Sequence, residues 1–296
     1  MLILYCSKPD PYRLKTLAKQ RLDTLLVSLD LCTSRQQAQA LIRTGKVSIN
    51  QQVVDKPGTE VDIASKIQIK ERSRYVSRGG DKLAKALEVF AIPVTDRICL
   101  DGGISTGGFT DCLLQAGAAK VYGVDVGYGQ ADWGLRNDPR VVLKERTNLR
   151  YMTPTELYGD SPVADLAVVD VSFISLDKIL PALWELLVPP KEAVLLVKPQ
   201  FEVGRERVGK KGVVRDSATQ ADAIFQVWKA ATALGWEEKG LTWSPLLGPA
   251  GNIEYLLWLG IDREPEPEPR AIEEGVVKER ILEVAKAAAR ELVNRL

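Results

Sequence analysis

One stretch, residues 98–126, constrains the fold more than any other part of the chain. A short apolar run ends at Asp101, and four glycines follow within seven residues. A helix-like run over 109–115 then leads to a second apolar run that ends at Asp125. This order predicts strand, turn, helix and strand, which together form one βαβ unit with an acid at the end of each strand.

The glycine turn and the two acids predict a nucleoside site more strongly than a purely structural turn. Glycine lets the backbone approach a ligand closely, and the start of the following helix offers free N–H groups. Asp125 lies where folds of this kind place an acid on a ribose. The spacing is not Gly-x-Gly-x-x-Gly, and no Gly-Lys-Ser/Thr follows, which disfavours a nicotinamide cofactor and a phosphate-binding loop. An acid just before the turn suits a ligand with a cationic end, such as S-adenosylmethionine.

The chain on either side of this unit predicts an α/β sheet. Helical periods predict helices over 81–90, 175–187 and 217–234, and apolar runs predict strands over 141–143, 165–171, 193–197, 241–243 and 253–259. Ser217 is expected to cap the last helix. This alternation predicts a Rossmann-like, doubly wound sheet that binds ligands at the carboxyl ends of its strands. Asp170 and Lys198 fall at two such ends, like Asp101 and Asp125.

Two stretches stand outside this alternation. Residues 201–215 predict a long loop with five Lys or Arg side chains, which favours a mobile phosphate clamp. Residues 263–296 open with repeated Glu-Pro, a stiff spacer, and continue as a helix. Its apolar positions 277, 281, 285, 288, 292 and 296 recur every three or four residues, so we expect this helix to pack on the body or on a partner.

Positive charge is concentrated at the beginning of the chain. Residues 1–80 hold 14 Lys or Arg against 7 Asp or Glu, although the whole chain carries a formal net charge of only +1. This excess predicts a polyanionic partner for the first part of the chain. The same part predicts two short helices, the second capped by Thr33 or Ser34, followed by a small curled sheet.

Composition excludes several kinds of site. The chain has no histidine, which rules out Ser-His and Cys-His catalysis. The four cysteines are scattered without a C-x-x-C pair, so we expect no metal site. There is no signal-peptide layout and no apolar run near the ~20 residues of a membrane helix. We therefore expect a soluble, cytoplasmic protein with no membrane partner; the oligomeric state is not predicted.

Residues 101–111, Asp-Gly-Gly-Ile-Ser-Thr-Gly-Gly-Phe-Thr-Asp, resemble the cofactor motif of S-adenosylmethionine-dependent methyltransferases. More narrowly, the run looks like the TlyA (hemolysin A) family of FtsJ-type rRNA methyltransferases. The start of the chain resembles the S4 RNA-binding domain, named after the fourth small-subunit ribosomal protein. The matching words there are Arg21-Leu-Asp-x-x-Leu, Ser34-Arg-x-x-Ala-x-x-Leu-Ile-x-x-Gly and Val47-x-Ile-Asn.

The resemblance implies four segments. They are an S4-like domain at 20–72, a linker at 73–79, an FtsJ-type methyltransferase domain at 80–262, and the spacer with the C-terminal helix at 263–296. The linker word Arg74-Tyr-Val-Ser resembles the one that the family carries at this place, with Tyr75 where many relatives have Trp. The C-terminal segment lies outside the resemblance.

The resemblance also implies 2′-O-methylation of ribosomal RNA, at cytidine, with rRNA or a ribosomal subunit as partner and S-adenosylmethionine as cofactor. FtsJ-type enzymes use a Lys-Asp-Lys-Glu set, and the chain matches it in order. The set is Lys82 in Ser-Arg-Gly-Gly-Asp-Lys-Leu, Asp170 in Val-Val-Asp-Val-Ser-Phe, Lys198 in Leu-Val-Lys-Pro-Gln-Phe-Glu and Glu254 in Gly-Asn-Ile-Glu-Tyr. We expect Lys198 to accept the proton of the ribose hydroxyl, Lys82 to orient that hydroxyl, and the two acids to hold the lysines.

Two further sets of residues are predicted. The cofactor set is Asp101, Gly103, Ser105, Thr106, Gly107, Gly108, Phe109, Asp125, Val126, Asn148 and Asp170. The RNA-binding set is Arg21, Arg35, Arg43, Lys46, Arg78, Arg205, Lys210 and Lys211. Considered one at a time, most of these residues could equally be turn residues or charged side chains in solvent.

Three alternatives remain open on the sequence. A non-catalytic RNA-binding or ribosome-assembly factor could keep the cofactor fold, although the complete Lys-Asp-Lys-Glu set argues against it. A membrane-active hemolysin is suggested by the family's second name, and the absence of a signal peptide and of amphipathic membrane segments argues against it. A dehydrogenase is disfavoured by the glycine spacing.

Overall fold

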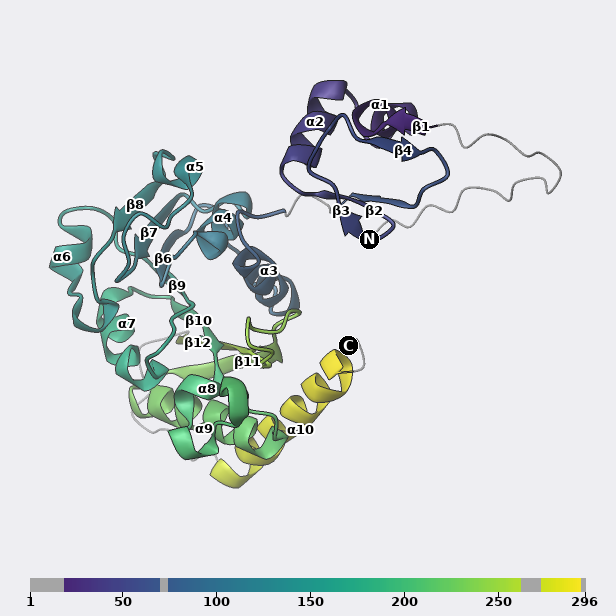
Figure 1. Ribbon diagram of the computed structural model, residues 1–296. Coiled ribbons are helices and arrows are strands. Elements are labelled where there is room, and N and C mark those ends of the chain that lie inside the picture. Colours follow the sequence, from purple (N-terminus) through teal and green to yellow (C-terminus); the bar gives the residue numbers. More distant parts are fainter. Residues whose placement is uncertain (1–18, 70–73, 262–272, 294–296) are drawn as a thin grey trace. The chain divides into compact units, whose positions relative to one another are not determined.

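The computed structural model describes residues 19–69, 74–261 and 273–293. The chain divides into two compact units, residues 1–73 and 74–296, and each is described by itself. Figure 1 shows their helices and strands with the labels used below. Across the described ranges, no helix combines the length and the apolar character that crossing a membrane requires.

The smaller unit pairs two helices with short strands (Figure 1). Its elements are β1 (Lys19–Arg21), α1 (Leu22–Ser28), α2 (Arg35–Arg43), β2 (Val47–Ile49), β3 (Gln52–Val53), β4 (Glu60–Asp62) and β5 (Ile67–Ile69). Strand β1 pairs with β4, and β2 lies between β3 and β5. Of the two predicted caps, Ser34 begins α2, because its hydroxyl accepts a hydrogen bond from the N–H of Gln37. Leu22, Leu26 and Ile42 are fully buried in the unit's own core.

The larger unit is built on a seven-stranded sheet in the order β11-β12-β10-β9-β6-β7-β8 (Figure 1). The strands are β6 (Ile98–Gly102), β7 (Lys120–Val124), β8 (Val141–Lys144), β9 (Leu166–Val169), β10 (Lys191–Val197), β11 (Glu237–Trp243) and β12 (Tyr255–Ile261). Strands β6 to β10 are parallel, and β12 is antiparallel to both of its neighbours. Strand order reverses between β6 and β9, which is the point where such sheets bind ligands.

Helices cover both faces of this sheet, so the predicted doubly wound architecture is confirmed. The longer helices are α3 (Gly79–Val89), α4 (Gly108–Gln115), α7 (Leu180–Leu186), α9 (Ser217–Ala233) and α10 (Glu274–Val293), and the shorter ones are α5 (Trp133–Arg136), α6 (Pro154–Tyr158) and α8 (Pro199–Glu202). Alternate residues of β9 face opposite ways. Leu166 and Val168 join the core under α3 and α4, and Ala167 and Val169 join the core under α7, α9 and α10.

Several predicted boundaries were wrong. The helix predicted over 175–187 begins as a 3-10 turn, Leu176–Lys178, and α7 starts only at Leu180. Asp216, not Ser217, caps α9, since its carboxylate accepts the Thr219 N–H at 2.8 Å. The loop predicted from residue 201 starts later, because α8 extends to Glu202, and two 3-10 turns, Arg205–Arg207 and Lys210–Gly212, interrupt it.

The C-terminal helix packs on the body of the larger unit. Its predicted apolar face is buried, with Ile281, Ala285 and Ala288 fully enclosed in the core shared with α9. An ion pair between Arg280 and Glu238 of β11 borders this contact at 2.6 Å. Predicted position 296, the whole Glu-Pro repeat and part of the predicted linker lie outside the described residues.

Candidate active site

Glycine is required at two places in the turn that follows β6. Gly103 has φ of +86°, and a Cβ there would lie 2.6 Å from the backbone oxygen of Asp170. Gly107 has φ of +97°, and a Cβ there would overlap the side chain of Leu135. Left-handed φ and these close contacts exclude larger residues without movement of the backbone. The turn therefore holds bare backbone at the carboxyl edge of the sheet, beside the end of β9.

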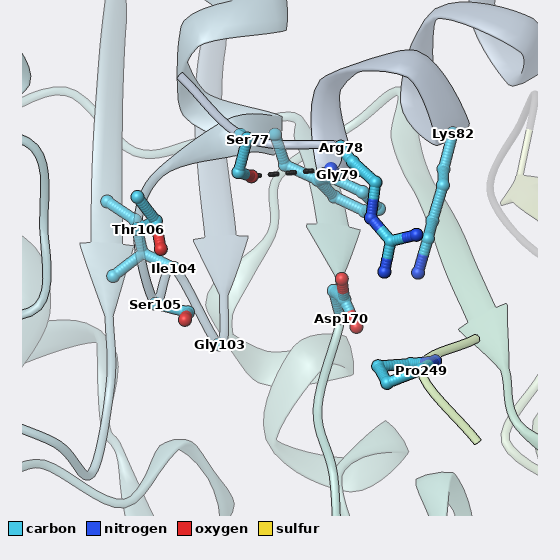
Figure 2. A pocket seen from close by; sticks show the side chains of 12 residues that line it. Ser77, Arg78, Gly79, Lys82, Gly103, Ile104, Ser105, Thr106, Asp170 and Pro249 are labelled. Atoms are coloured by element: carbon cyan, nitrogen blue, oxygen red, sulfur yellow. Dashed lines mark hydrogen bonds between the residues drawn. The ribbon is translucent and has the colours of Figure 1, made fainter. Parts of the chain in front are cut away.

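A cavity of about 210 Å³ opens beside this turn. Figure 2 shows Arg78 and Lys82 pointing from the start of α3 toward the side that carries Asp170 and Pro249. The residues that line the cavity are Ser77, Arg78, Gly79, Lys82, Gly103, Ile104, Ser105, Thr106, Gly108, Phe109, Asp170 and Pro249. Six of the predicted cofactor residues are among them: Gly103, Ser105, Thr106, Gly108, Phe109 and Asp170.

Asp101 lies beneath the turn, fully buried, and does not line the cavity. Thr110 Oγ1 donates a hydrogen bond to Asp101 Oδ2 at 2.7 Å, while Oδ1 has no partner among the described residues. Burial raises the pKa of Asp101 to about 7 despite the Thr110 hydrogen bond. A buried carboxylate with one unpaired oxygen is a group that a cationic ligand would stabilise.

Asp125 follows β7, and its carboxylate accepts hydrogen bonds from two backbone N–H groups. Its Oδ2 accepts the Ser105 N–H at 2.8 Å, and its Oδ1 accepts the Gly127 N–H at 2.6 Å. Each oxygen has a second lone pair, so these bonds leave room for ligand hydroxyls. Val126 beside it is 70% exposed, and Asn148 uses its side-chain oxygen to accept the Arg150 N–H. Neither residue lines the cavity.

The four residues of the predicted catalytic set form two short ion pairs. Lys82 Nζ lies 2.6 Å from Glu254 Oε2, and Lys198 Nζ lies 2.6 Å from Asp170 Oδ1. Lys198 also donates to Ser172 Oγ at 2.9 Å. Lys82, Lys198 and Glu254 are buried, and each lysine contacts one carboxylate.

The antiparallel strand β12 explains how Glu254 reaches this edge. Val197 at the end of β10 pairs with Tyr255 at the start of β12. Because the strands run in opposite directions, Lys198 and Glu254 follow and precede that pair at the same edge of the sheet. This edge also carries the carboxyl ends of the parallel strands, and Lys82 reaches it from α3.

Two aromatic residues beside these pairs were missed from the sequence. Phe173 is 91% exposed and has φ of +64°, a conformation that Phe rarely adopts. Its ring lies 5.0 Å from that of Phe201, centre to centre. The signal was present as a Phe three residues after Asp170 and another three residues after Lys198. A solvent-facing aromatic ring in a strained backbone is a candidate for ligand contact.

In the smaller unit, one buried acid organises two of the predicted RNA-binding arginines. Asp23 is fully buried and accepts hydrogen bonds from Arg21, Arg35 and Gln39 at 2.9–3.1 Å. These bonds, from Arg21 above all, hold the pKa of Asp23 well below its usual range. The Arg21 and Arg35 side chains are still about half exposed, at 48% and 58%. Arg43 is exposed as well, and Lys46 is half-buried.

The predicted cations of the larger unit lie apart from one another along the chain. Arg78 is exposed and lines the cavity. Arg205, Lys210 and Lys211 are exposed on the segment between α8 and α9. Neighbouring Arg207, which was not in the predicted set, is tied to Asp222 of α9 at 2.6 Å.

The sheet order, the glycine turn and the acids at strand ends define a Rossmann-like, nucleoside-cofactor class of α/β protein. Comparison with known families narrows this class. Residues 75–261 match the FtsJ-like methyltransferase model, and residues 20–67 match the S4 domain model. The chain belongs to the FtsJ-like methyltransferase family.

Individual relatives agree with this assignment. The 16S/23S rRNA (cytidine-2'-O)-methyltransferase TlyA of Mycobacterium tuberculosis is 48% identical over 87% of this chain and 96% of its own. A Bacillus subtilis protein provisionally named the rRNA methyltransferase YqxC is 50% identical over 86% of this chain and 91% of its own. A solved structure from Streptococcus thermophilus, provisionally named a hemolysin, shares 42% identity with a TM-score of 0.70, covering 95% of this chain and 99% of that one.

Proposed function

We propose that this protein is an S-adenosylmethionine-dependent 2′-O-methyltransferase of ribosomal RNA, acting at cytidine. The observation that carries the proposal is the pair of buried lysine–carboxylate contacts, Lys82–Glu254 and Lys198–Asp170, at the edge of the cavity. Buried ion pairs contribute little to stability compared with apolar packing, so two of them beside one cavity favour a catalytic role. RNA binding alone would not require them. The names of the relatives supply the substrate class.

The residues at this edge fit the proposed cofactor. The bare backbone of the glycine turn leaves space that a Cβ would fill, and Asp101 keeps an unpaired buried oxygen for a cationic group. Asp125 retains lone pairs for a ribose diol. We assign the turn from Gly103 to Phe109 and the two acids to the cofactor. The cofactor supplies a methyl group on a positively charged sulfur, which makes that methyl group electrophilic.

The protein's own groups would then prepare the ribose hydroxyl. The hydroxyl is a weak acid and must lose its proton as its oxygen attacks the methyl group. Lys198 Nζ is fixed by Asp170 and Ser172, and in its neutral form it would accept that proton. Lys82, fixed by Glu254, would stabilise the negative charge that develops on the oxygen. Holding the hydroxyl in line with the methyl group supplies several kcal/mol by removing translational freedom.

The same edge offers a place for the base of the target nucleotide. Phe173, which is exposed, pairs with the half-buried Phe201 next to Asp170 and Lys198. Aromatic side chains stack on unpaired bases in RNA, at roughly 1–3 kcal/mol per base. The exposed cations of the smaller unit and of the segment between α8 and α9 would bind phosphates.

Substitution of Lys198 tests the proposal. We expect Lys198→Ala to abolish transfer of labelled methyl from S-adenosylmethionine to rRNA, while cofactor affinity stays within about three-fold, since its partner would be the RNA hydroxyl. Lys198→Arg should fail almost as badly, because a guanidinium does not give up its proton in a protein. Lys191→Ala, at the opposite end of β10, is the matched control and should keep the wild-type rate. A Lys198→Arg variant with most of the single-turnover rate would contradict the base assignment.

A further inference from the structure

We infer that Glu202 is a positioning residue for the methyl-transfer site: it ties the segment that carries Asp170 to the segment that carries Lys198. This inference rests on the proposed function. Glu202 is the last residue of α8, and neither the cavity nor the predicted catalytic set includes it. Its role follows from how the two segments are joined beyond the ends of their strands.

The parallel strands β9 and β10 stop supporting each other before the catalytic residues are reached. Their last paired residues are Val169 and Leu195. Within the described ranges, no backbone hydrogen bond joins residues 170–176 to residues 198–202. Between these two segments, therefore, side chains supply the direct contacts, while the Asp170 N–H donates to the Gly102 oxygen at 2.9 Å.

Side-chain contacts cross between the two segments at three places, in the same order along both. Lys198 contacts Asp170 at 2.6 Å and Ser172 Oγ at 2.9 Å, and the ring of Phe201 lies 5.0 Å from that of Phe173. At the far end, Ser175 Oγ donates to Glu202 Oε2 at 2.6 Å. The first two contacts are formed by the groups that would act on the nucleotide. The third contact is formed by groups that neither line the cavity nor belong to the aromatic pair.

Glu202 differs from Lys198 and Phe201 because it also binds the backbone of the other segment. Besides the Ser175 hydroxyl, its carboxyl group accepts the Leu176 N–H at 3.1 Å and 3.3 Å. This N–H opens the 3-10 turn Leu176–Lys178, so Glu202 holds the backbone as well as a side chain. Glu202 is half-buried, and this burial raises its pKa to about 7 although the bonds from Ser175 and Leu176 lower it.

Loss of the Glu202 contacts should change how the side chains of Asp170 and Lys198 are aligned, while the cofactor still binds. A displacement of about 1 Å can cost on the order of 100-fold in rate when reacting groups must be aligned. Phe173 would shift relative to Phe201, and the side chain of Asp170 relative to Lys198, while the Asp170 backbone stays bonded to Gly102. The glycine turn, Asp101 and Asp125 belong to other strands and would keep their places.

The test compares Glu202→Ala with Glu202→Gln in the full-length protein. The Gln amide oxygen can still accept from Ser175 and Leu176, so we expect its single-turnover rate to stay within about three-fold of wild type. We expect Glu202→Ala to lower that rate by about ten-fold or more at saturating RNA and cofactor, with the S-adenosylmethionine Kd changed by less than about three-fold. Ser175→Ala should lower the rate in the same direction.

A matched control separates positioning from general destabilisation. Tyr158→Phe removes a buried hydrogen bond from α6 to the Leu186 carbonyl at the end of α7, a bond to which neither segment contributes, and should lower the Tm without lowering the rate. Hydrogen exchange gives a readout that does not depend on activity. Peptides covering 170–178 and 198–204 should exchange faster in Glu202→Ala and should not do so in Tyr158→Phe.

The outcomes distinguish the inference from the proposed function. A wild-type protein that transfers no methyl group to rRNA would remove the proposed function, and unchanged exchange in Glu202→Ala would separately overturn the connection between the segments. An active wild type with a Glu202→Ala rate within two-fold would overturn the inference alone. The same holds if Glu202→Gln, with a wild-type Tm, loses as much rate as Glu202→Ala.

Discussion

The protonation of the buried Asp101 should change when a positively charged cofactor binds. Its pKa is raised to about 7 by burial, so near pH 7 about half of the molecules carry a proton on it. A cationic group paired with its free Oδ1 would favour the ionised form and lower the pKa. We therefore predict that binding of S-adenosylmethionine at pH 7 releases about half a proton from this residue, and that the release fades above pH 8.

Isothermal calorimetry in two buffers of different ionisation enthalpy measures this release at constant pH. The apparent binding enthalpy should differ between the buffers for the wild type. Asp101→Asn has no proton to lose at this position and serves as the control, so its buffer dependence should be smaller by the same half proton. Identical buffer dependence in the two proteins would show that the cofactor's cation is bound elsewhere.

For single residues, the sequence indicated which residue types form the site but not which side chains contact each other. Glu254 could be placed at the start of a strand, but its contact with Lys82, 172 positions away, depends on the antiparallel pairing of β12 with β10. Phe173 is part of a word that drew attention for its Asp170, and its exposure depends on a positive φ that no local pattern predicts. Spacing along the chain does not encode such long-range register or strain.

Among the elements, the segment between α8 and α9 shows what a charge pattern can and cannot predict. Five cations predicted a mobile phosphate clamp, and mobility is still a prediction. The structure adds that the end of the segment is fastened. Asn252 accepts the Val214 N–H at 2.9 Å and donates to the Gly212 oxygen at 2.8 Å, and Val213 and Val214 are buried. Arg205 is exposed, and so are Lys210 and Lys211 of the 3-10 turn Lys210–Gly212, which we call the tip of the segment.

Charge reversal at this tip should weaken RNA binding without affecting the cofactor. We predict that Lys210→Glu with Lys211→Glu lowers rRNA affinity and reduces the slope of log affinity against log salt by about one per lost phosphate contact. Fluorescence titrations of labelled RNA at several salt concentrations measure both quantities. Lys229→Glu with Lys286→Glu makes the same change of charge on α9 and α10, and an equal loss of affinity there would contradict a local contact.

Helical periodicity was the most reliable signal among the elements. The apolar positions of α10 were predicted from spacing alone, and the structure buries Ile281, Ala285 and Ala288 against the core. Boundaries were less predictable, because Ser217 and Asp216 are both good caps and only the geometry of the Thr219 N–H decides between them.

For the whole molecule, we propose the division into an S4-like domain at 20–72, a linker at 73–79, a methyltransferase domain at 80–262 and a C-terminal segment at 263–296. Each of the two compact units has its own hydrophobic core. Tyr75 of the proposed linker is buried in the larger unit, and the Val76 N–H donates to Asp111 Oδ2 at 2.8 Å. This part of the proposed linker is therefore packed into the larger unit.

The distribution of charge predicts that the smaller unit contributes to RNA affinity and that the larger unit binds the cofactor. Removal of residues 1–72 takes away most of the positive excess, so RNA affinity should fall and its salt dependence should flatten. The affinity for S-adenosylmethionine should persist, because the glycine turn, Asp101 and Asp125 lie in the larger unit. Filter binding across a salt series, with calorimetry for the cofactor, checks both halves. An unchanged salt slope would assign RNA binding to the larger unit alone.

The proposed 2′-O-methylation is tested most directly by identifying which atom of the RNA receives the methyl group. A ribose that carries a 2′-O-methyl group cannot be cleaved by alkali at its 3′ side, since that cleavage needs the free 2′-hydroxyl. We predict that rRNA labelled by this protein with methyl-labelled S-adenosylmethionine, and then digested with alkali, yields its label in alkali-stable dinucleotides that begin with cytidine. Label recovered in single nucleotides would mean a methylated base and would contradict the proposed chemistry of Lys198.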